Sequence, residues 1–120
     1  MKSRSLLTAG LALLVAAAVA VPATASGRAG TTVTIKYNGD GFQGKVKSTR
    51  ASCIANRTVK VYKQRGSVQD PSTDQKLYTD TSDSTGRWDT GTSGQVHGKF
   101  YARARGTTRC KPDSSPTIHT

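Results

Sequence analysis

Residues 76–90 limit the folds open to this chain, because they combine extended and turn-forming stretches and carry no helical pattern. Residues 77–81 suit a pleated strand, and the Ser-Asp-Ser-Thr cluster after them cannot sustain a regular element. Gly86 supplies the positive φ that a tight connection often needs, and residues 87–90 resume an extended run. This segment therefore predicts a strand, a turn and a second strand.

Five further stretches have the composition or the alternation of short, half-buried strands. They are residues 31–37, 42–48, 57–63, 99–105 and 116–120. Turn-forming residues such as Asn38 and Gly39 separate them, and helix formers are scarce. We expect an all-β fold of about seven strands in a two-layer sandwich, with a small barrel as the alternative.

The apolar positions that should face the core follow from the same alternation. Trp88 is the only tryptophan, and in so small a domain its large apolar area has few places to go except the core. The other predicted core residues are Val33, Ile35, Tyr37, Phe42, Gly44, Val46, Val59, Val61, Phe100, Ala102, Ala104 and Ile118. Tyr62 and Tyr101 are predicted to face outward.

The first 25 residues have the pattern of a secretory signal peptide. A short basic region precedes an apolar run over residues 6–21, and a small-x-small cleavage site ends at Ala25. The run is short for a membrane span of about 20 residues and stops at Pro22. We expect a secreted, extracellular protein without a transmembrane segment after cleavage, with a flexible leader over residues 26–30 and one domain over residues 31–120.

The exported part of the chain is strongly basic. Two of the 18 lysines and arginines leave with the signal peptide, so 16 remain against 7 acidic residues, a net charge of +9. Such a surface attracts polyanions: nucleic acid, cell-wall polymers or anionic membranes. The alternative is that the charge serves solubility alone.

Cys53 and Cys110 are the only cysteines, and both lie in the exported part. In an oxidising compartment we expect them to form a disulfide. The chain-entropy model assigns about 4 kcal/mol to closing a loop of this length. Their spacing is far from Cys-x-x-Cys, which disfavours a redox pair.

Basic residues on two predicted strands give the best lead to a binding site. Arg103 and Arg105 flank an outward Tyr101, and Lys45 and Lys47 alternate outward on another strand. If these strands share a sheet, its open face is a basic strip with an aromatic residue, suited to phosphates or acidic sugars. An ordinary solvated sheet face would show the same alternation.

Catalytic and metal-binding patterns are weak. His97 and His119 could cleave RNA as acid and base, but their positions in the sequence do not show that they meet. Asp80, Asp83 and Asp89 lack the spacing and the glutamate of a calcium loop, so turn formation explains them better. We identify no metal site, no cofactor and no catalytic residue.

Two groups of residues resemble a known family. They are Phe42, Gly44, Val46, Cys53, Arg57, Val59 and Val61 in the first half, and Thr79, Asp80, Gly86, Trp88, Gly98, Phe100, Ala102, Ala104 and Cys110 in the second. Their pattern is similar to secreted bacterial β-sandwiches of the carboxypeptidase-regulatory-like (transthyretin-like) group. The resemblance covers residues 33–119 and implies a Greek-key fold of the immunoglobulin-like or prealbumin-like type. It also implies a Cys53–Cys110 disulfide and no catalytic residues. The His-Arg-His pattern of transthyretin-like hydrolases is not present.

These observations favour a secreted, non-enzymatic binding or accessory protein that recognises anionic extracellular polymers through a basic sheet face. One alternative is a small secreted hydrolase, such as a ribonuclease that uses His97 and His119. Another is an inhibitor or toxin that acts through residues 64–75, the longest irregular stretch and the one expected to be most mobile.

Overall fold

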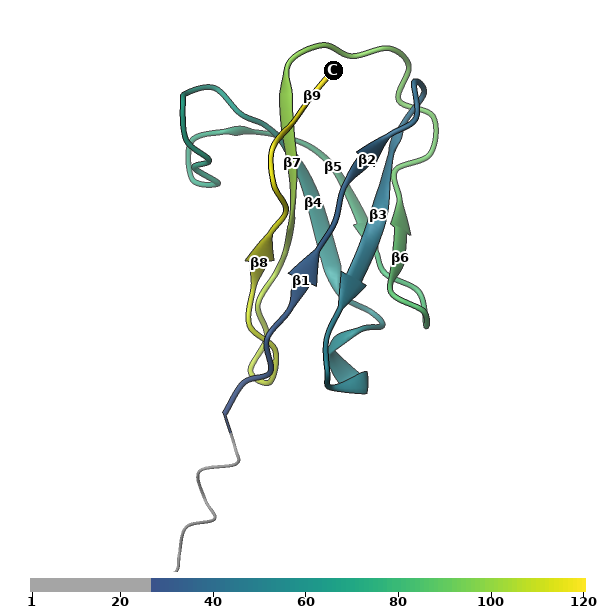
Figure 1. The fold of residues 1–120 in the computed structure, drawn as a ribbon, viewed down its shortest axis with the longest axis vertical. Helices are drawn as coiled ribbons and strands as arrows, with labels where there is room; N and C mark the ends of the chain where they lie inside the picture. Colours follow the sequence, from purple (N-terminus) through teal and green to yellow (C-terminus); the bar gives the residue numbers. More distant parts are fainter. Residues whose placement is uncertain (1–26) are drawn as a thin grey trace, which may run out of the picture.

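Two antiparallel β-sheets pack face to face in the computed structural model, which describes residues 27–120 (Figure 1). The predicted signal peptide lies outside the described residues. The strands are β1 (Thr32–Val33), β2 (Lys36–Tyr37), β3 (Phe42–Lys47), β4 (Thr58–Lys63), β5 (Gln75–Thr81), β6 (Arg87–Asp89), β7 (Lys99–Ala104), β8 (Asp113–Ser114) and β9 (Ile118–His119). The all-β prediction is confirmed.

The first sheet is built around β3. Strands β1 and β2 pair with consecutive parts of one edge of β3, and β6 pairs with the other edge. The predicted strand 31–37 is therefore interrupted. At the break, the Thr34 backbone N–H donates to the Lys45 carbonyl, and the Thr34 hydroxyl accepts from the Lys45 N–H at 2.9 Å. A side chain thus replaces a backbone carbonyl in the ladder.

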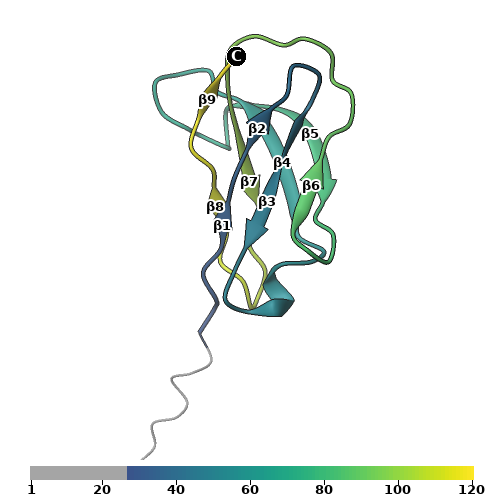
Figure 2. The same ribbon diagram turned by 45° about the vertical axis from the view of Figure 1, so that its right-hand side comes forward.

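The second sheet has the order β5-β4-β7, and β8 and β9 pair with consecutive parts of the free edge of β7. In Figure 2, which is turned by 45° from Figure 1, this second sheet lies behind β1, β2 and β3. Sequence alternation did not predict β8, which has only two residues. A register shift between Val61 and Tyr62 leaves Leu77 unpaired beside Tyr78, so both side chains pack against the core.

The core lies between the sheets, and the predicted inward positions are confirmed. Its buried members are Val33, Phe42, Val46, Val59, Val61, Trp88, Phe100, Ala102 and Ala104. Partly buried residues complete it: Ile35, Tyr37, Leu77, Tyr78, Val96 and Ile118. The Phe42 ring packs at 5.0 Å from the rings of both Tyr37 and Phe100, which joins the two sheets.

A disulfide between Cys53 and Cys110 closes the lower end of the sandwich, with Cα atoms 5.6 Å apart. The predicted pairing is confirmed. The short 3₁₀ turn η2 (Ala51–Cys53) carries the first cysteine. Beside Cys110, the Ala29 N–H donates to the Arg109 carbonyl and the Ala29 carbonyl accepts from the Lys111 N–H. The predicted leader therefore contains a residue that the fold holds in place.

Arg57 is buried at the same end, with 2% of its surface exposed. Its guanidinium donates to the Thr31 hydroxyl and to three backbone carbonyls, those of Cys53, Arg105 and Lys111. The segments around residues 31 and 105–111 thus meet the turn before β4 at one side chain. The fork of donors on arginine makes this possible.

Candidate functional site

The outer face of the second sheet carries four basic side chains on adjacent strands. Lys60 on β4 lies directly opposite Arg103 on β7, and Arg105 follows two residues later on the same face. Lys76 on β5 pairs with Tyr62, next along β4 on this face. We call Lys60, Lys76, Arg103 and Arg105 the basic face.

The side chains of the basic face are close enough to influence one another. The pKa of Lys60 is lowered, first by the neighbouring Lys76 ammonium, then by partial burial and by Arg105. Like charges directly opposite each other destabilise a sheet, so this arrangement has a cost for folding. Asp74 lies on the same side of the sheet, but it is buried and bonded to Tyr101.

The predicted basic strip was wrong in two respects. Lys45 and Lys47 belong to β3 in the first sheet, so they do not share a face with Arg103 and Arg105. Tyr101 does point away from the core, but it is 0% exposed and offers no stacking surface to a ligand. Lys60 lies between the inward residues Val59 and Val61, so alternation places it outward, whereas the irregular pairing of β5 conceals the position of Lys76.

Residues 64–74 cover the upper part of this outer face. The Tyr62 and Tyr101 rings stack at 5.2 Å beneath them, and the Tyr101 hydroxyl donates to Asp74 at 2.6 Å. The Asp74 carboxylate also accepts from the backbone N–H groups of Arg65 and Asp70. These bonds hold the pKa of Asp74 below its usual range, with the Tyr101 hydroxyl as the largest cause. The segment is therefore held at several points, and its expected mobility stays a prediction.

The two histidines lie at one end of the molecule. Strand β9 places His119 opposite Lys99, and the next pair, Gly98 and Thr120, exchanges two backbone hydrogen bonds. His97 directly precedes Gly98, and both histidines are exposed. Strand pairing thus places both histidines at the same end of the molecule, which the sequence could not show.

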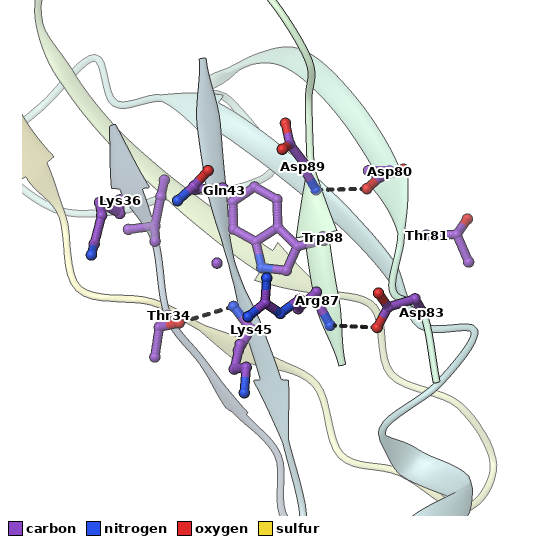
Figure 3. Close-up of a pocket in the computed structure, with 12 residues that line it drawn as sticks. Thr34, Lys36, Gln43, Lys45, Asp80, Thr81, Asp83, Arg87, Trp88 and Asp89 are labelled. Carbon is purple, nitrogen blue, oxygen red and sulfur yellow. Dashed lines mark hydrogen bonds between the residues drawn. The ribbon is translucent and has the colours of Figure 1, made fainter. Parts of the chain in front are cut away.

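The outer face of the first sheet contains a hollow of about 580 Å³ (Figure 3). Two cross-strand rows line it. The first runs from Lys36 through Gln43 to Asp89, and the second from Thr34 through Lys45 to Arg87. The remaining lining residues are Ile35, Gly44, Asp80, Thr81, Asp83 and Trp88.

The three aspartates at the hollow are fixed by backbone groups. Asp80 accepts from the Asp89 N–H at 2.7 Å, and Asp83 accepts from the Arg87 N–H at 3.0 Å. Asp89 accepts from the Gly91 N–H at 2.7 Å. For Asp83 and Asp89 this agrees with the turn-forming interpretation, whereas Asp80 lies inside β5 and its hydrogen bond crosses to β6. Within residues 27–120, no group of three or more His, Cys, Asp or Glu side chains could hold a metal ion.

Comparisons of the chain with protein-family models, with curated proteins and with solved structures find no match. Among residues 27–120, no helix has the length and apolar character required to span a membrane.

Proposed function

We propose that this protein is an extracellular, non-enzymatic binding protein that holds anionic polymers on the basic face of its second sheet. The observation that carries the proposal is the placement of Lys60 directly opposite Arg103, with Lys76 and Arg105 beside them. A sheet that served only as a solvated surface would gain stability from alternating charge signs across its strands. Four cations on adjacent strands are instead suited to a repeating anion.

The strand arrangement supports the expected fold type. If the pairs β1–β2 and β8–β9 are each counted as one interrupted strand, the nine strands agree with the expected seven. In this count the first strand (β1–β2) pairs with the second (β3), and the second pairs with the fifth (β6). This order suits a Greek-key sandwich of the immunoglobulin-like type. The resemblance to the carboxypeptidase-regulatory-like group stays a prediction. Secretion is supported by the disulfide, which is typical of oxidising compartments.

Binding of a DNA duplex and of heparin to the mature, oxidised protein tests the proposal. Four phosphate contacts predict a slope of about −3 to −4 when the logarithm of the DNA association constant is plotted against that of the salt concentration. The double variant Lys60→Gln/Arg105→Gln should lower that slope by about two, because each lost phosphate contact removes about one.

A matched control separates the basic face from net charge. Lys45→Gln/Lys47→Gln also removes two positive charges, but from the first sheet. It should leave the salt slope nearly unchanged. If the salt slope fell equally in the two double variants, or if no binding occurred at low salt, the basic face would not be the binding site.

A further inference from the structure

The hollow on the first sheet has two lysines on one side and three aspartates on the other, where Arg87 of β6 lies beside Asp83. Lys36 and Lys45 lie at its β2–β3 side, and Asp80, Asp83 and Asp89 lie at its β5–β6 side, as Figure 3 shows. A uniform polyanion would meet three carboxylates here, so this site differs in chemistry from the basic face. A ligand with a negative group at one end and a positive group at the other would satisfy both sides.

The distance between the two sides sets the length of such a ligand. Lys36 and Asp89 both align with Gln43, so they lie two strand spacings apart. Two spacings amount to about 9.5 Å. An extended peptide advances about 3.3–3.6 Å per residue, so three residues span this distance. The volume of about 580 Å³ lies in the range of small-ligand sites.

The carboxylates are arranged to accept a further donor. One oxygen each of Asp80, Asp83 and Asp89 is bonded to a backbone N–H, which fixes its orientation. Within residues 27–120, no hydrogen bond engages the second oxygen of any of the three. Such a preorganised group binds a cation without further loss of side-chain entropy.

Trp88 supplies an independent observation at the same place. It lines the hollow, it is 2% exposed, and its Nε1–H has no hydrogen-bond partner within the described residues. Buried indole N–H groups usually have a partner, so an unpaired one calls for an explanation.

We propose that the hollow binds a short zwitterionic peptide of about three residues. Its carboxylate would lie toward Lys36 and Lys45, and its ammonium toward Asp80 and Asp89. The peptide's carbonyl groups would lie over Gln43 and Arg87, which can donate to them.

Titration with trialanine, followed by the fluorescence of Trp88, tests this site. Trp88 is the only tryptophan in the chain, so the signal reports on the hollow directly. We expect a saturable change with free trialanine, and an affinity at least about tenfold weaker for the peptide acetylated and amidated at its two ends. A doubly blocked peptide that binds equally well, or no saturable change, overturns the proposal.

Variants assign the two ends of the peptide. Lys36→Gln should weaken binding of free trialanine and leave binding of C-terminally amidated trialanine unaffected. Asp89→Asn keeps an acceptor for the Gly91 N–H, and it should weaken only peptides with a free ammonium. Lys47→Gln, on the neighbouring strand β3 but outside the hollow, is the control and should change neither. If a DNA duplex displaces trialanine and Lys36→Gln abolishes that displacement, the hollow belongs to the polyanion site and the proposal is wrong.

Discussion

Gly44 shows how strongly a single missing side chain shapes the first sheet. A Cβ atom at this position would lie 1.9 Å from the Thr34 carbonyl oxygen and 2.8 Å from Cζ2 of Trp88. Neither contact is possible for a real Cβ atom, so close approach, and not a special φ, requires glycine here. The space that Gly44 leaves allows the Trp88 ring to enter the core beside the broken part of the ladder.

Gly44→Ala should lower the free energy of unfolding by about 1–3 kcal/mol, the usual cost of overpacking. Either the Thr34 backbone or the Trp88 ring must move, and urea denaturation followed by Trp88 fluorescence measures the loss. Gly66→Ala is the control because no atom lies within 4 Å of its new Cβ. It should change stability by no more than about 0.5 kcal/mol. Similar effects of the two substitutions would contradict the steric explanation.

Arg57 marks a limit of prediction at this scale. The alternation of Val59 and Val61 does place residue 57 on the inward side of its strand, and a charged residue there is unusual. Its hydrogen-bond partners, however, come from loops near residues 31, 53, 105 and 111. No local pattern in the sequence indicates that these loops converge.

Among the larger elements, residues 64–74 depend on a charged hydrogen-bond centre at Asp74. The folded pKa of this carboxyl lies below its unfolded value of about 3.9, so the carboxylate stabilises the fold above that pH. The contribution is lost as the pH falls through the folded pKa.

Asp74→Asn should therefore reduce stability at pH 7, and the difference from the natural protein should shrink as the solution is acidified below about pH 4. Urea unfolding at a series of pH values measures this. The pKa values of Asp70 and Asp83 are also lowered by hydrogen bonds. The stability of the variant should therefore still depend on pH, but less than that of the natural protein. Asp40→Asn, at an exposed residue, is the control. A pH-independent difference between Asp74→Asn and the natural protein would contradict this explanation.

Strand prediction succeeded wherever a long alternation met the core. The stretches that became β3, β4 and β7 were predicted within one residue at each end, because each buries apolar side chains at every second position. The burial of Tyr101 was not predictable, because its cover comes from residues 64–74, whose conformation depends on non-local hydrogen bonds. The hollow was not predictable either, since it requires the registers of four strands.

At the edge of β6, aspartate side chains accept hydrogen bonds from backbone N–H groups, a feature that alternation alone does not explain. Asp80 lies opposite the inward Val59, yet its carboxylate reaches across to the exposed edge of β6 and accepts the Asp89 N–H. Asp83 accepts the Arg87 N–H on the same edge. A charge directed inward from an edge strand discourages pairing with another chain.

For the molecule as a whole, the seven aspartates have one shared role. Each accepts a hydrogen bond from a backbone N–H or a hydroxyl group of the fold. The negative charges thus serve local structure, while most of the positive charges lie on exposed side chains. This division explains how a strongly basic chain can fold and still present a positive surface to a ligand.

Replacement of both cysteines by serine should lower the free energy of unfolding by about 4 kcal/mol, from the entropy of the open loop in the unfolded chain. Urea denaturation of the double variant and of the reduced natural protein measures this loss. The two should agree, because both lack the cross-link. A loss below about 1 kcal/mol would show that the unfolded chain is already compact around this loop.

The disulfide also determines how the chain would respond to tension. Force applied between its two ends would pass from Cys53 directly to Cys110, since the covalent bond bypasses the 57 positions that separate them. That stretch includes β4, β5, β6 and β7 and would bear no load, whereas β1, β2 and β3 before Cys53 and β8 and β9 after Cys110 would be pulled out. About 200 Å of extended chain would thus stay slack. If the protein were held at one end and pulled at the other, most of the second sheet would stay folded at forces that unravel the first sheet.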